Sequence, residues 1–225
     1  MTTLIAEDLL LLLLEDDSGK LTNATYVDVG LGGALLVELA LGGAVEVVKG
    51  AGLWARAKVV PAGAVPSDPV LVEAMRVVSE KQRTAQDLVA RLGKKRRDAL
   101  LERLEGKGIL ERREDRAMGL FPRTRWPAVD SSHEADVRRQ LGDALVRGVQ
   151  PAERIAALIA LLSALDLAHK VVDREGVPAR DVKKRAKTVA DGDWAAKAVR
   201  DSIVAAQAAV AAAAVAATTV ASTGG

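Results

Sequence analysis

Six consecutive leucines, Leu9–Leu14, constrain the fold more than any other feature of the sequence. A helix with leucine on every face has no side to present to water, so other parts of the protein must surround it. The run is far shorter than the roughly 20 apolar residues that cross a membrane. It also lacks the basic flank of a signal peptide. We therefore predict a buried helix over residues 4–15, with Thr3 as its N-cap.

The core around this helix must be aliphatic. Hydrophobic residues make up 49% of the 225 residues, but aromatic residues make up only 2%. Leucine and alanine favour helices, and the aromatic residues that favour strands are nearly absent. We predict a mainly α protein, formed by a single globular helical domain over residues 1–217 and a flexible tail over 218–225.

Apolar periodicity and glycine or proline breaks predict the individual elements. After the leucine helix, helices are expected over residues 31–41, 70–81, 84–92, 94–105, 133–148, 152–172, 178–190 and 193–217. Alternating patterns around turns predict β-hairpins over 44–60 and 111–125, the second of them projecting. The alanine-rich residues 203–221 fit a packed helix better than a membrane span, because polar residues interrupt them.

Residues for catalysis and metal binding are scarce. The chain has no cysteine, and its two histidines, His133 and His169, stand far apart, so neither a zinc site nor a Cys–His nucleophile pair can be built. The glycines of 30–33 lack the spacing of a dinucleotide loop and indicate close helix packing instead. We predict that the chain is not an enzyme and holds no cofactor and no metal.

A basic cluster, Lys94–Arg97, opens the segment 94–110. If these residues form the first turn of a helix, Lys94 and Arg97 emerge on one side of it. Cations beside the free N–H groups of a helix start suit an incoming phosphate. The alternative is an ordinary solvated turn. The net charge of the whole chain is only +2, so affinity for a polyanion must come from such local clustering.

Residues 84–125 also permit a winged-helix interpretation. A helix, a turn, a basic second helix and a hairpin follow in the order of that motif, with Arg123 and Arg125 at the wing. A DNA-binding regulator is therefore the alternative function. We nevertheless do not expect nucleic acid to be the partner, because the rest of the chain indicates something else.

Four segments in order resemble the Golgi phosphoprotein 3 family. They are LIAEDLLLLLLEDDSGKL, GLGGALLVELALGG, LLERLEGKGIL and RIAALIALLSALDLAHKVV, and the resemblance runs from about residue 3 to about residue 215. It implies a mostly helical fold with a projecting hairpin. It also implies a peripheral membrane protein that binds phosphatidylinositol 4-phosphate. A composition rich in Ala, Arg, Val and Gly suggests a bacterial member.

The resemblance assigns residues to two contacts. The Trp and the three Arg of the family's headgroup site fall on Asn23, Gly32, Lys94 and Arg97, so the last two keep their positive charge and the first two are changed. The family's hairpin contacts the membrane or a second copy, which here implicates the apolar tip residues Met118, Leu120 and Phe121.

From this resemblance we expect a cytoplasmic, non-enzymatic adaptor that associates reversibly with membranes. Its partner would be an anionic phospholipid, such as a phosphoinositide, and protein clients or a homo-oligomer would be further partners.

Overall fold

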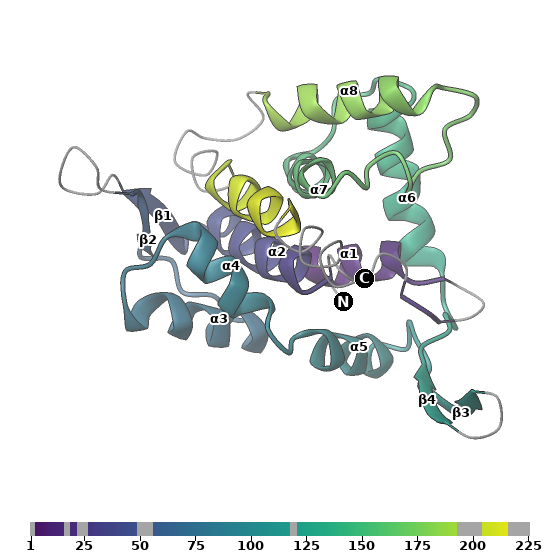
Figure 1. Ribbon diagram of the computed structural model, residues 1–225, viewed down its shortest axis with the longest axis horizontal. Coiled ribbons are helices and arrows are strands. Elements are labelled where there is room, and N and C mark those ends of the chain that lie inside the picture. Colours follow the sequence, from purple (N-terminus) through teal and green to yellow (C-terminus); the bar gives the residue numbers. More distant parts are fainter. Residues whose placement is uncertain are drawn as a thin grey trace, which may run out of the picture.

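Helices α1 (Ile5–Leu13) and α2 (Val27–Leu41) lie at the centre of the fold, and the other elements pack around them (Figure 1). The computed structural model describes residues 3–15, 19–21, 27–48, 56–117, 121–192 and 204–215, with the side chains of 115–117 and 121–123 left out. On one side of α2 lie α3 (Pro69–Glu80), α4 (Ala85–Gly93) and α5 (Arg97–Gly106). On the other lie α6 (Ser132–Leu145), α7 (Glu153–Ala164) and α8 (Ala179–Ala190).

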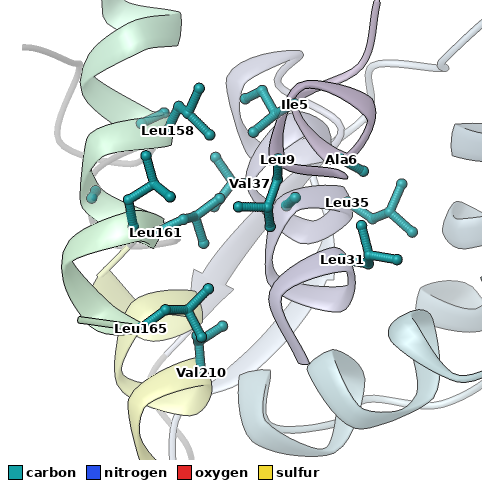
Figure 2. Close-up of a cluster of buried hydrophobic side chains, with 14 of the residues drawn as sticks. Ile5, Ala6, Leu9, Leu31, Leu35, Val37, Leu158, Leu161, Leu165 and Val210 are labelled. Atoms are coloured by element: carbon teal, nitrogen blue, oxygen red, sulfur yellow. The ribbon is translucent and has the colours of Figure 1, made fainter. Parts of the chain in front are cut away.

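Every residue of α1 is buried, which confirms the interpretation of the leucine run. Figure 2 shows leucines of α1, α2 and α7 meeting in the centre, with Val210 of the helical residues 204–215 closing one side. Thr3 is not the N-cap as predicted. Leu4 occupies that position, and the Thr3 hydroxyl lies 2.9 Å from Nε2 of His133 instead.

The glycines of α2 allow close helix contacts, as the sequence predicted. A Cβ at Gly30 would lie 2.9 Å from a methyl group of Leu9, and a Cβ at Gly33 would lie 2.4 Å from a methyl group of Val210. Such separations are shorter than van der Waals contact. Side chains at these positions would therefore push the neighbouring helices away from α2.

Two small antiparallel hairpins complete the fold. Strands β1 (Val45–Val48) and β2 (Lys58–Pro61) pair with Val45 opposite Pro61, and the predicted turn between them lies outside the described residues. Strands β3 (Arg113–Ala117) and β4 (Phe121–Arg125) pair with Arg113 opposite Arg125. This second hairpin projects from the helical body beyond α5, as predicted (Figure 1).

Helix α7 is shorter than the predicted helix 152–172. It ends at Ala164 because Asp166 has a left-handed backbone (φ 56°) and the N–H of Leu167 turns back to the carbonyl of Leu162 at 2.8 Å. Leu165 and Leu167 remain buried beyond this end. Apolar periodicity alone therefore did not reveal where the helix stops. In the described part of the chain, no helix is both long and apolar enough to cross a membrane.

Candidate anion-binding site

The basic cluster 94–97 forms the turn between α4 and α5. Lys94 is extended (φ −60°, ψ 122°), Lys95 is left-handed (φ 58°), and α5 begins only at Arg97. The prediction that Lys94 and Arg97 share one face of a helix is therefore wrong. A physical reason is that four cations in the first turn would oppose the positive end of the helix dipole, and the turn keeps three of them outside α5.

A contact between two backbones fixes this turn on α2. A Cβ at Gly32 would lie 2.0 Å from the carbonyl oxygen of Val89, and a Cβ at Gly93 would lie 1.7 Å from the carbonyl oxygen of Asp28. Only glycine allows the helices to approach so closely. Because Gly93 directly precedes Lys94, the position of the basic turn follows from the crossing of α2 and α4.

The cations of the turn differ in their surroundings. Arg96 donates to Glu73 of α3 at 2.6 Å, and this hydrogen bond, above all, lowers the pKa of the Glu73 carboxyl. Lys94 and Lys95 are exposed and form no ion pair with any residue that the structure describes. Two positive charges thus face solvent without a carboxylate partner among the described side chains.

Arg97 faces a hollow of about 420 Å³. Three segments line it: the connection after α1, the start of α5 and the base of β4. Its charged lining residues are Lys20, Arg97 and Asp98, and Trp126 supplies an aromatic wall. The Nε of Arg97 is buried and has no hydrogen-bond partner among the described residues. Buried polar groups are normally paired, so this N–H is an unsatisfied donor in a residue that lines the hollow.

Trp126 is held firmly in this wall. Its side chain is only 8% exposed, and the guanidinium of Arg112 lies 6.0 Å from the centre of its ring. Gly19, with a left-handed backbone, packs against the backbone of Trp126, where a Cβ would lie only 2.3 Å from the nitrogen. Our sequence reasoning missed Trp126 and Lys20 as site residues. The rarity of tryptophan, with three in the chain, was the available signal.

A comparison with known protein families identifies the chain. The model of the family Golgi phosphoprotein 3 (GPP34) matches residues 5–206. The chain belongs to the Golgi phosphoprotein 3 family. A search of the curated proteins found no match.

The four headgroup positions of the Golgi phosphoprotein 3 family are only partly assembled here. Gly32, Lys94 and Arg97 lie around the crossing of α2 and α4, but only Arg97 lines the hollow. Gly32 is buried beneath α4 and offers no side chain to a ligand. Asn23 lies outside the described residues.

The expected membrane contact of the hairpin falls largely outside the described part of this Golgi phosphoprotein 3 domain. Met118 and Leu120 are outside the described residues, and Phe121 begins β4 but its side chain is not described. The basic hairpin strands themselves are present. The exposed Arg112 and Arg113 near their base pair with Glu114 and Glu111, both at 2.8 Å.

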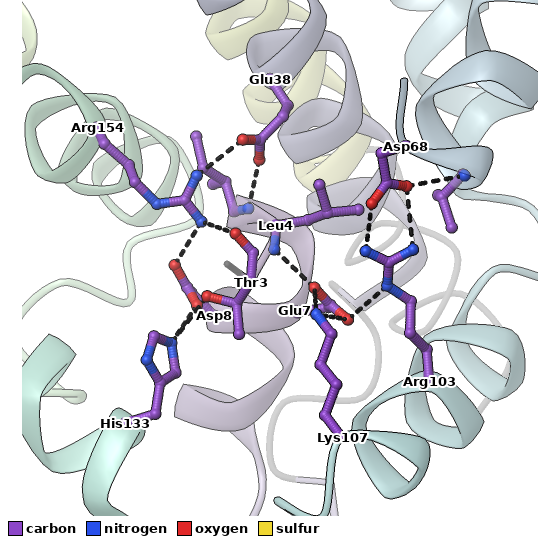
Figure 3. A network of polar contacts seen from close by, with 12 residues as sticks. Thr3, Leu4, Glu7, Asp8, Glu38, Asp68, Arg103, Lys107, His133 and Arg154 are labelled. Carbon is purple, nitrogen blue, oxygen red and sulfur yellow. Dashed lines mark hydrogen bonds and ion pairs between the residues drawn. The ribbon is translucent and has the colours of Figure 1, made fainter. Parts of the chain in front are cut away.

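A buried ion-pair network holds the far end of α5 against α1 (Figure 3). The carboxylate of Glu7, which is fully buried, accepts from Nε of Arg103 at 2.9 Å and from Nζ of Lys107 at 2.7 Å. It also accepts from the backbone N–H of Leu4 at 2.6 Å. Arg103 donates as well to Asp68, which precedes α3. The network therefore joins α1, α3 and α5.

A second group of charges joins α1 to α6 and α7. Arg154 donates to Asp8 at 2.8 Å and to Glu38 at 2.7 Å, and Asp8 also contacts His133 at 2.8 Å (Figure 3). Burial raises the pKa of the Glu38 carboxyl above its ordinary value, and Arg154 opposes that shift. These pairs are partly buried and position α1. They also account for His133, which the sequence left without a role.

Proposed function

We propose that this protein docks reversibly on anionic phospholipid headgroups through the basic turn 94–97 and the hollow beside it. The observation that carries the proposal is Arg97, which lines the hollow together with Lys20 and whose buried Nε lacks a hydrogen-bond partner among the described residues. A phosphate oxygen is a strong acceptor for a guanidinium, which can donate to it through two N–H groups. The exposed Lys94 and Lys95 would add attraction to a negatively charged surface.

Family membership supports the same proposal. The resemblance stated above implies binding of phosphatidylinositol 4-phosphate, and positive charge is retained at Lys94 and Arg97. We propose that the protein is a cytoplasmic, non-enzymatic adaptor whose hairpin β3–β4 adds a second membrane contact. Protein clients or a second copy of the chain would be recruited at that surface.

The winged-helix alternative has less support from the geometry. A recognition helix must present basic and polar side chains to the major groove. The exposed positions of α5 instead carry Asp98, Glu102 and Glu105, whereas Arg103, and Lys107 directly after the helix, turn inward to Glu7. An acidic outer face would repel DNA phosphates.

Liposome co-sedimentation tests the proposal. The protein is mixed with vesicles that contain phosphatidylinositol 4-phosphate and with phosphatidylserine vesicles of matched charge. We expect binding to anionic vesicles that weakens on the order of tenfold or more in the double variant Lys94→Ala, Arg97→Ala, since each charge-assisted contact contributes about 1.5–3 kcal/mol. Lys184→Ala with Lys187→Ala, which removes two exposed positive charges from α8, away from the turn and the hairpin, is the matched control.

Each outcome separates the alternatives. A preference for the phosphoinositide that disappears in the double variant supports a headgroup site. Equal binding to both vesicle types reduces the site to an electrostatic surface. Absence of vesicle binding at physiological salt refutes the proposal, and binding of duplex DNA through the same residues would establish the regulator instead.

A further inference from the structure

Helix α3 carries apolar side chains on its outward face as well as its inward face. Ala74 and Val78 point into the bundle and are buried. On the other side, Val72 is 48% exposed, and Val65, just before the helix, is 89% exposed. Together with Pro66, Pro69 and Met75 they line an open hollow of about 650 Å³. Exposed apolar surface that is contiguous, rather than scattered, marks a contact site.

The surface defined by these residues, called here the α3 surface, borders the basic turn. Glu73 lines the hollow of the α3 surface and pairs with Arg96 of the turn at 2.6 Å. Arg76 lines the same hollow and also acts electrostatically on Glu73. The negative charge of Glu73 is thus balanced by the guanidinium groups of Arg96 and Arg76. The α3 surface and the basic turn therefore adjoin each other through Glu73.

The surrounding charge selects the kind of partner. Residues 69–97 contain eight basic and three acidic side chains, a net charge of +5, whereas the whole chain has a net charge of only +2. The remainder of the chain is therefore net negative in total, and within 69–97 the positive charge lies in the turn 94–97 and in Lys81 and Arg83, between α3 and α4. Apolar side chains flanked by lysine and arginine suit the boundary between the headgroups and acyl chains of an anionic bilayer.

We propose that the α3 surface enters the interfacial region of an anionic phospholipid bilayer when the basic turn binds headgroups. This inference rests on the proposed function and adds to it an apolar contact apart from the hairpin. Electrostatic attraction through Lys94 and Lys95 brings the protein to the membrane, and Val65, Val72 and Met75 then leave water. Binding through both contacts keeps a component that high salt does not remove, because salt screens charges but not apolar burial.

A single fluorescent label tests this contact. The chain has no cysteine, so Val72→Cys carries an environment-sensitive dye at one site only. Val149→Cys is the matched control. Val149 is 55% exposed, similar to Val72, and lies between α6 and α7, on the opposite side of the bundle from α3 (Figure 1). Vesicles of two parts phosphatidylcholine to one part phosphatidylserine are added to each protein, and co-sedimentation is measured in parallel.

We expect the dye at position 72 to brighten and shift to the blue on vesicle addition, while the dye at position 149 does not change. In unlabelled protein, Val72→Glu should weaken vesicle binding about tenfold, since it places a charge where an apolar group was to be buried, and Val149→Glu should leave it unchanged. Both valines are exposed, so neither substitution disturbs the core.

The other outcomes overturn the proposal in distinguishable ways. If the protein co-sediments but the dye at position 72 does not respond, the α3 surface is not a membrane contact, and the proposed function stands without it. If the dye responds to unlabelled protein in the absence of lipid, the partner is a second copy. If no form of the protein binds vesicles, the inference and the proposed function fail together.

Discussion

The buried carboxylate of Glu7 should stabilise the fold far more than the surface ion pairs do. It accepts from Arg103, from Lys107 and from the backbone N–H of Leu4, and none of its side chain is exposed. Glu7→Gln keeps the shape of the side chain but removes its charge. The two cations, 23% and 11% exposed, would then stay mostly buried with less compensation.

We expect a loss of about 3 kcal/mol in the free energy of unfolding. Breaking a buried pair by removing one partner costs about 3–5 kcal/mol. The lower end applies here because Arg103 keeps its contact with Asp68. For a chain of this size, that loss lowers Tm by about 6–12 °C, at about 2–4 °C for each kcal/mol. Urea unfolding followed by circular dichroism measures the free energy of unfolding, and thermal unfolding followed in the same way measures Tm.

Two further variants isolate the cause. Glu111→Gln breaks an exposed ion pair, in which the side chain of Glu111 is 48% exposed and that of Arg113 is 62% exposed. Its loss should cost no more than about 1 kcal/mol. Combining Glu7→Gln with Lys107→Met removes one of the cations and should recover part of the loss. A Glu7→Gln variant as stable as Glu111→Gln would refute the reasoning, because the buried network would then contribute no more than a surface pair.

Two other predictions follow from backbone contact and from ionisation. Gly32→Ala should destabilise the fold by about 1–3 kcal/mol in the same unfolding assay, because its Cβ would lie 2.0 Å from a carbonyl of α4. Gly106→Ala, which meets no atom within 4 Å, should be neutral or stabilising. Burial opposes the ionisation of Asp68, but hydrogen bonds from Arg103 and the N–H of Val70 outweigh it and hold its pKa below the ordinary 3.8. Because its pKa is lower in the folded state, ionised Asp68 stabilises the fold above pH 3.8. This stabilisation is lost as the pH falls through the folded-state pKa. Asp68→Asn should thus cost about 1 kcal/mol at pH 7, and the difference from the unaltered protein should shrink as the pH falls below 3.8; a difference independent of pH would contradict this.

The central packing was predictable from the sequence because composition and pattern agree on it. Leucine on every face of residues 9–14 leaves burial as the only outcome, and the glycines of 30–33 indicated close helix contacts that the structure contains. The hairpin 111–125 also followed from alternation. Family membership was predictable from the order of four segments, although each segment alone would have been weak evidence for it.

The site was harder to predict because it depends on contacts between distant segments. Local periodicity gave no sign that Lys95 leaves the helical region of the backbone, since the apolar pattern runs on through both sides of the turn. The pairing of Glu7 with Arg103 joins residues 96 positions apart, and first-turn acids ordinarily indicate only a favourable helix dipole. Trp126 reaches the wall of the hollow from the end of the hairpin, where no spacing rule connects it to Arg97.

The contact of Gly32 and Gly93 also determines how a binding event would spread. No side chain separates α2 from α4 there, so no change of rotamer can absorb a displacement of the basic turn. At the next position, Gly33, α2 packs against Leu161 of α7, and a Cβ there would lie 3.1 Å from a methyl group of that leucine. Capture of a headgroup should therefore slow amide hydrogen exchange along α2 and into α7, at a distance from the lipid, as well as in α5.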